Sequence, residues 1–182
     1  MDAFGLVLLA LAGSAGSVSS ATGGGPTSRW TAGPRQDEGL AVELHEGGDY
    51  AILVNGQYWL QNAATYFNVD GTLYSTADGT LALTDGPVEG SGSDALGPYR
   101  LFTWTWAAGA AAIETSVAVY DDSPSLVFGQ KFLSAVAGTS LGDPNGVVSS
   151  FPSFQVQDGL PEKGFLSIYG RFLGQKRVTI AK

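Results

Sequence analysis

The side chains of this sequence that could take part in chemistry are carboxylates, aromatic rings and a single histidine. Four of them lie in the stretch SDALGPYRLFTWTW, residues 93–106: Asp94, Tyr99, Trp104 and Trp106. The face of an aromatic ring is electron-rich and complements the C–H-rich side of a sugar. A carboxylate accepts hydrogen bonds from hydroxyl groups. These four residues are therefore the candidates for contact with carbohydrate or with another protein surface.

The rings of this stretch also fit a protein core. Phe102, Trp104 and Trp106 recur at every second residue, so a β-strand places them on one face and Thr103 and Thr105 on the other. Burying such a ring removes about 150–250 Å² of surface from water. The alternation favours the core for the two tryptophans and leaves ligand or interface contact as the alternative.

Paired carboxylates are the second kind of chemistry to weigh. Glycoside hydrolysis uses two carboxyl groups about 5–10 Å apart, and the acidic residues available are Asp94, Glu114, Asp121 and Asp122. The adjacent Asp121 and Asp122 precede Pro124, where aspartate is expected as a turn residue. Glu114 alternates with apolar neighbours and is expected to face solvent. The sequence assigns no catalytic residue, and catalysis by this chain alone is the less favoured interpretation.

Metal, cofactor and phosphate chemistry find no support. His45 is the only histidine and there is no cysteine, so a zinc site of the usual ligands is not predicted. The sequence has neither a G-x-S-x-G nucleophile elbow nor a G-x-x-x-x-G-K-[ST] phosphate loop. Asp-Gly pairs are present, but the ligand spacing and closing glutamate of a calcium-binding EF-hand are not. We predict no cofactor and no metal.

Composition and charge indicate one acidic, β-rich domain. Of the 182 residues, 44% are hydrophobic and 26 are glycine, while 14% are charged, against roughly 25% in typical globular chains. The net charge of −8 and the lack of a basic patch exclude nucleic acid as a predicted partner.

The N-terminus has the pattern of a secretory signal peptide. An apolar run at residues 3–12 is followed by small residues, which is typical of such a leader, although its first residues include Asp2 and no basic side chain. The run is shorter than the ~20 residues that span a membrane. We predict a signal peptide at residues 1–21, a Gly- and Pro-rich linker at 22–38, and a folded, secreted domain at 39–182 with no membrane span.

The elements that must position these residues are short strands joined by turns. Asn55-Gly56 lies between two apolar runs and predicts a hairpin. Asp70-Gly71 and Asp78-Gly79 predict two successive hairpin turns. Alternating segments at 40–46, 98–107, 112–122 and 125–134 predict strands, the last three as an antiparallel meander with the turn at 121–124. The predicted fold class is all-β, an antiparallel β-sandwich.

Three segments occur in an order that resembles a known family. These are SDALGPYRLFTWTW, IETSVAVYDDSPSLVFGQKF and VVSSFPSF. Together they resemble the N-terminal β-sandwich region of the α-galactosidase, raffinose synthase and α-glucosidase-like clan of glycosidases. The resemblance covers residues 40–170, and its motifs fall on Asp94 and Gly97, Trp104 and Trp106, residues 117–120, 127–132 and 150–154. Pro152 is expected at a strand start, edge or bulge, with Phe151 and Phe154 closing one end of the sandwich.

The resemblance implies a supersandwich of the galactose-mutarotase type that packs on a (β/α)₈ barrel. In such enzymes the barrel carries the catalytic carboxylates, so no catalytic residue is transferred to this chain. The chain would be either a piece truncated at its C-terminal end or a freestanding relative. The predicted function is a non-catalytic accessory domain of a secreted glycosidase-like protein that contacts carbohydrate. The alternatives are a docking module for another domain or protein and a small carbohydrate-active enzyme in its own right.

Overall fold

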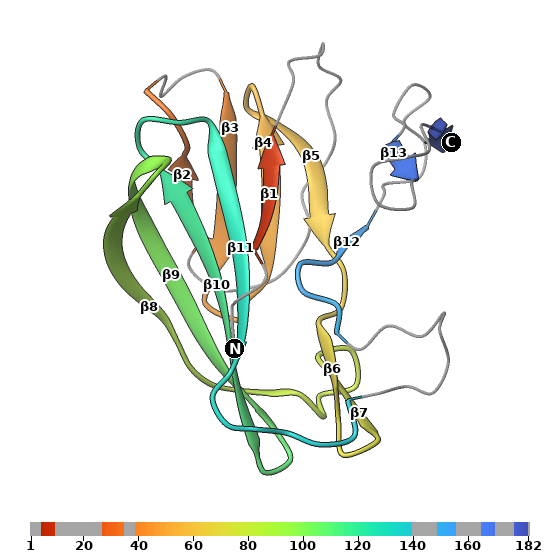
Figure 1. The fold of residues 1–182 in the computed structure, drawn as a ribbon. Helices are drawn as coiled ribbons and strands as arrows, with labels where there is room; N and C mark the ends of the chain where they lie inside the picture. Colours follow the sequence, from red (N-terminus) through yellow and green to blue (C-terminus); the bar gives the residue numbers. More distant parts are fainter. Residues whose placement is uncertain are drawn as a thin grey trace.

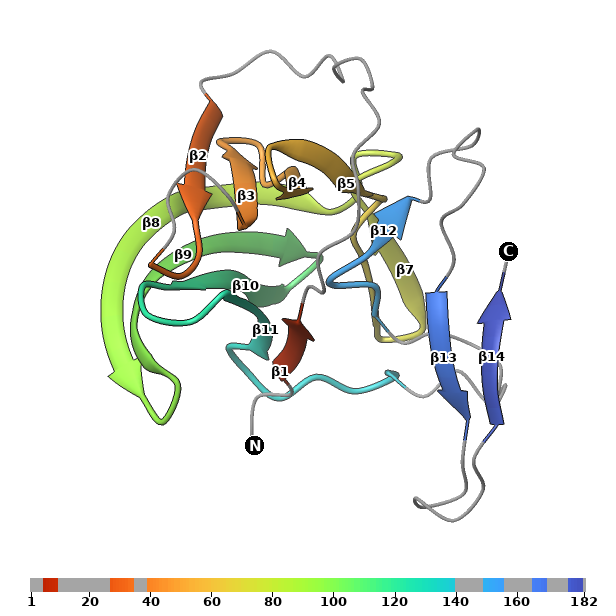
Figure 2. The ribbon, with the colours of Figure 1, turned by 90° about the horizontal axis from the view of Figure 1, so that it is seen from above.

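The computed structural model describes residues 5–9, 27–34, 39–139, 149–155, 165–169 and 177–181. Within these residues the protein is all-β and contains no helix. Two five-stranded antiparallel sheets lie face to face, and two two-stranded hairpins accompany them (Figures 1 and 2). The predicted β-sandwich class is confirmed.

The first sheet contains the long strands of the sequence. Its order is β1-β11-β10-β9-β8. The bounds are β1 Gly5–Leu9, β8 Ala82–Asp94, β9 Gly97–Ala108, β10 Ala111–Tyr120 and β11 Ser125–Phe132. The predicted meander is present, because β9, β10 and β11 are consecutive neighbours and the turn at 121–124 joins the last two.

The second sheet has the order β12-β5-β4-β3-β2. Its bounds are β2 Thr27–Thr31, β3 Leu40–His45, β4 Tyr50–Val54, β5 Gln57–Asn62 and β12 Phe154–Gln155. The hairpins pair β6 Tyr66–Val69 with β7 Thr72–Ser75, and β13 Phe165–Tyr169 with β14 Arg177–Ala181. Figure 2 shows β2 beside β3, at the edge of the second sheet.

The core lies between the sheets and is built by period-two alternation. Leu40, Val42 and Leu44 point inward from β3, while Ile113, Val117 and Val119 do so from β10. Aromatic contacts bridge the layers, since the rings of Trp30 and Phe102 lie 5.0 Å apart and those of Tyr50 and Phe128 lie 5.3 Å apart. Such ring pairs add stability beyond their area of burial.

Two of the three predicted hairpin turns are confirmed. Asn55 and Gly56 have φ values of 51° and 74°, and Asp70 and Gly71 have 51° and 73°, as expected for turns that need positive φ at both central residues. The turn at Asp78-Gly79 does not form a hairpin. The strand before it, β7, pairs with β6, and the strand after it, β8, belongs to the first five-stranded sheet. There the Asp78 side chain accepts hydrogen bonds from the N–H and hydroxyl of Thr80.

Two elements differ from the sequence prediction. Residues 27–31, predicted as part of the linker, form β2, because Trp30 packs on the core and Arg29 pairs with Glu43 of β3. Residues 82–94 form the long strand β8, although their sequence ALTDGPVEGSGSD is rich in glycine and polar residues. Pairing with β9 along most of its length, with two register shifts, compensates for that composition.

The FPSF segment leads into the edge strand β12 and packs its two phenylalanines against the core. Phe151 and Phe154 each place a ring within 5.9 Å of the Tyr50 and Phe128 rings. The hydroxyl of Tyr50 donates to the carbonyl oxygen of Ser153 at 2.9 Å and accepts from its N–H at 2.8 Å. These bonds satisfy a hydroxyl group that is buried with its ring.

Of the predicted signal peptide, the structure describes residues 5–9, which form β1. The candidate cleavage region at 15–21 lies outside the described residues. In the part of the chain that the structure describes, no helix is long and apolar enough to cross a membrane.

Candidate functional site

The four candidate residues separate into two groups. Trp104 and Trp106 are core residues, 2% and 4% exposed, and Trp106 donates its indole N–H to the buried hydroxyl of Thr115 at 2.8 Å. Neither ring has a face available to a ligand, so both leave the candidate site. Asp94 and Tyr99 lie on the outer face of the first sheet, at the turn between β8 and β9.

Asp94, Tyr99 and Tyr120 form what we call the aspartate–tyrosine cluster. Tyr120 ends β10 and stands directly opposite Tyr99 of β9, with the two ring centroids 5.2 Å apart. The Tyr120 hydroxyl donates to Oδ2 of Asp94 at 2.6 Å, and the N–H of Leu96 donates to Oδ1 at 2.8 Å. The first bond ties the hairpin end of β8 to β10 across the intervening strand.

The three residues of the cluster differ in their exposure to solvent. Tyr120 is buried, at 2% exposed, Tyr99 is half-buried, and the Asp94 carboxylate is exposed. An ionised carboxylate offers about four lone-pair positions, so its two bonds leave acceptor capacity toward solvent. The cluster thus presents a hydrogen-bond acceptor beside a half-buried aromatic ring.

Gly92 makes the position of the Tyr99 ring possible. The two residues are cross-strand partners, and a Cβ placed on Gly92 would lie 2.6 Å from Cζ of Tyr99. Any larger residue at 92 would push the ring away from the sheet. The glycine that makes β8 a poor strand by composition therefore seats the aromatic group of the site.

The charges of the cluster are fixed by its hydrogen bonds. The bond from the Tyr120 hydroxyl, with that from the Leu96 N–H, lowers the pKa of Asp94 below its ordinary value. Burial, together with the bond to Asp94, raises the pKa of Tyr120 to about 12. At neutral pH the pair is a carboxylate and a neutral phenol, and the phenol remains a donor.

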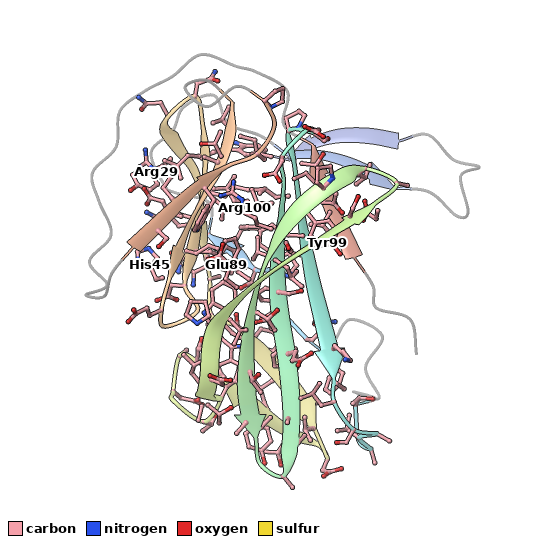
Figure 3. All side chains as sticks on the ribbon, turned by 90° about the vertical axis from the view of Figure 1, so that its left-hand side faces the viewer. Arg29, His45, Glu89, Tyr99 and Arg100 are labelled. Carbon is pink, nitrogen blue, oxygen red and sulfur yellow. The ribbon has the colours of Figure 1, made fainter. Side chains whose placement is uncertain are left out.

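The next residue along β9 faces the opposite way. Arg100 points from the first sheet toward β2, as Figure 3 shows, and its guanidinium carbon lies 4.4 Å from the centroid of the Trp30 ring. Its Nε lies 3.5 Å from Oδ1 of Asp121. The cation–π contact links β9 to β2, and the ion pair makes Asp121 a structural partner of Arg100.

A second cluster was not predicted from the sequence. On β3, the buried carboxylate of Glu43 accepts hydrogen bonds from the guanidinium of Arg29 and, at 2.7 Å, from the hydroxyl of Tyr58. Burial raises the pKa of Glu43, but the bonds from Tyr58 and Arg29 outweigh burial and the net pKa is lowered. Strand alternation places the Glu43 side chain on the face opposite to Val42 and Leu44. Its partners come from β2, which pairs with β3, and from β5, which pairs with β4. The sequence did not reveal these strand pairings.

The remaining acidic candidates, Glu114 and Asp122, lie in β10 and in the turn that follows it. Glu114 faces outward as predicted and lies 3.7 Å from Nζ of Lys131, and Asp122 lies near Gly97 at the turn after β10. Among the described residues, no group of three or more histidine, cysteine, aspartate or glutamate side chains could hold a metal ion.

Comparison with known proteins gives no relative on which to base a function. No family model matches the chain, and neither a curated protein nor a solved structure matches it significantly. The residues and geometry of the described part of the chain are therefore the basis for a proposed function.

Proposed function

We propose that this chain is a secreted, non-catalytic β-sandwich module of a glycosidase-like protein, and that it contacts carbohydrate through the aspartate–tyrosine cluster. The observation that carries the proposal is the exposed Asp94 carboxylate beside the half-buried Tyr99 ring. A neutral sugar presents hydroxyl donors and C–H-rich faces, which suit an acceptor next to an aromatic ring.

The partners of three of the carboxylates support the proposed non-catalytic role. Asp94 is tied to Tyr120, Asp121 to Arg100, and Glu114 to Lys131. Each of these pairings serves the sheet or its turns. The catalytic carboxylates of the resembling glycosidases belong to their barrel, and a (β/α)₈ barrel is the partner domain that we propose for this module.

The test is isothermal titration of the folded chain with methyl α-galactoside and methyl α-glucoside. We expect one of them to bind with a Kd of about 1 mM, a value typical of weak recognition. Tyr99→Ala should weaken binding at least about tenfold, because it removes the ring surface. The matched control is Tyr74→Ala, since Tyr74 is also half-buried and also lies against a glycine, Gly109.

Two outcomes would contradict the proposal. One is the absence of heat with either glycoside at tens of millimolar, with folding verified by circular dichroism. The other is equal loss of binding in Tyr99→Ala and Tyr74→Ala, which would show that the effect does not arise at the cluster.

A docking surface for another domain is the second candidate function. It is favoured by Leu96, which lies in the same turn as Asp94 and is 45% exposed. Sedimentation velocity at high concentration would detect self-association, and Leu96→Ser should abolish it if this surface is responsible.

A further inference from the structure

The two edges of the first sheet differ. One edge strand is β8, and the other is β1, which pairs with β11. β1 pairs antiparallel with β11 over five residues, from Gly5 opposite Gly129 to Leu9 opposite Ser125. All of β1 lies within the predicted signal peptide, so removal of that leader would uncover β11.

The side of β11 that β1 occupies can be derived from the backbone. The N–H of Leu133 donates to the carbonyl of Ala112 in β10. Successive residues of a strand turn their N–H and C=O groups to opposite neighbours, so the odd-numbered residues of β11 bond to β10. The N–H and C=O groups of Leu126 and Phe128 therefore face β1, and they lose their partners when β1 is absent.

β11 has few of the devices that protect an edge strand. Its residues 125–130 carry no charge and no proline, and the side chains of Leu126 and Phe128 are fixed in the core, at 0% and 1% exposed. β8, in contrast, combines two register shifts with Pro87 and the acidic residues Asp85 and Glu89. Bulges, proline and charge are the features that keep edge strands from pairing.

We propose that the edge of β11 is a strand-accepting site, and that its ligand is an extended, uncharged, aliphatic segment of a partner polypeptide. The ligand binds antiparallel in the position of Gly5–Leu9, with its backbone bonded to Leu126 and Phe128. Main-chain bonds of this kind give β-augmentation its affinity. This interaction is independent of carbohydrate contact, because the aspartate–tyrosine cluster lies at the β8 side of the sheet.

The experiment uses the full chain with paired proline substitutions in β1. Leu6→Pro with Leu8→Pro removes the two N–H groups that face β11, because these residues stand opposite Phe128 and Leu126. Val7→Pro with Leu9→Pro is the matched control, since its lost N–H groups face away from β11 and proline is tolerated on the outer side of an edge. The probe is a fluorescein-labelled peptide, AFGLVLLA followed by three lysines for solubility.

We expect the probe to bind the Leu6→Pro, Leu8→Pro chain at least about tenfold more tightly than the unmodified chain or the control, measured by fluorescence anisotropy. Hydrogen exchange should show fast Leu126 and Phe128 amides in that variant, slowed by the probe. The Val127 amide, which faces β10, should stay protected throughout and reports that the sheet is intact.

Three results would overturn the proposal. In the first, the Leu6→Pro, Leu8→Pro chain fails to bind the probe although its Leu126 and Phe128 amides exchange fast, which would mean that the open edge accepts no strand. The unmodified chain binds as tightly as the variant, so the probe binds elsewhere. The Val127 amide also loses protection in the variant, so Gly5–Leu9 is an indispensable strand of the fold and the edge is never vacant.

Discussion

The outer faces of the two sheets each carry a tyrosine hydrogen-bonded to a carboxylate, and the two pairs are arranged in opposite ways. On the second sheet the carboxylate of Glu43 is buried, and its partners Tyr58 and Arg29 cover it. On the first sheet the tyrosine, Tyr120, is buried and the carboxylate of Asp94 is exposed. The same two functional groups thus form a closed structural pair on one sheet and an open pair on the other.

The difference shows how burial, rather than residue type, separates stability from recognition. A buried carboxylate must keep all its partners, because leaving it unpaired costs several kcal/mol. An exposed carboxylate exchanges one partner for water or a ligand at little cost. Glu43 therefore belongs to the fold, while Asp94 is the carboxylate that the proposed glycoside contact would use.

Loss of the Glu43 carboxylate is expected to lower the free energy of unfolding more than loss of either partner in the Asp94–Tyr120 pair. Glu43→Ala removes the acceptor for Tyr58 and Arg29, and bonds to charged groups contribute about 1.5–3 kcal/mol. Because the Arg29 side chain is 50% exposed, we expect a loss of about 2 kcal/mol in the free energy of unfolding by urea. Glu114→Ala, which removes an exposed ion pair with Lys131, should change it by less than about 1 kcal/mol.

The Tyr120 hydroxyl should contribute less, and its contribution should depend on alkaline pH. Tyr120→Phe is expected to cost about 1 kcal/mol near pH 7, the usual contribution of one hydrogen bond. The folded-state pKa of Tyr120 is raised to about 12 from an ordinary value of 10, so its stabilisation is complete below pH 10 and is lost as the pH rises toward 12. Urea unfolding between pH 9 and 12 should show a smaller decline in Tyr120→Phe than in the unmodified chain. An identical decline would mean that the hydroxyl is not held as described.

Asp94→Asn should have the smallest effect on stability and a clear effect on binding. The pKa of Asp94 is lowered, so its contribution is present above the ordinary carboxyl pKa and is lost as the pH falls through the lowered value. Since the carboxylate is exposed, water screens the change, and the urea midpoint at pH 7 should barely move. Glycoside affinity should fall in the same variant. If the urea midpoint fell as far as in Glu43→Ala, the contrast between the two pairs would be lost.

Strand alternation and turn chemistry made much of the fold predictable. The inward positions of β3, β9, β10 and β11 followed from period-two patterns, and the Asn55-Gly56 turn from its need for positive φ. β8 was not predictable, because its glycines and its one proline disfavour a strand when considered without β9. β2 was not predictable either, since one tryptophan in a polar stretch gives no periodic signal.

The candidate site was predictable only in part for a related reason. Asp94 and Tyr99 were recognised as polar and aromatic residues beside a turn, but Tyr120 is distant in sequence and joins them through the register of β9 with β10. Trp104 and Trp106 had the right chemistry for a ligand, and their alternation with Thr103 and Thr105 already favoured the core that they occupy.

The reciprocal bonds between Tyr50 and Ser153 have a consequence for the order of folding. They join residues 103 positions apart, and such distant contacts form late because closing a long loop costs entropy before any contact repays it. While the chain is being synthesised, the second sheet must wait for the FPSF segment before Tyr50 acquires its hydrogen-bond partner. The rate at which the sandwich closes should therefore depend on the arrival of Ser153 more than on the formation of any hairpin.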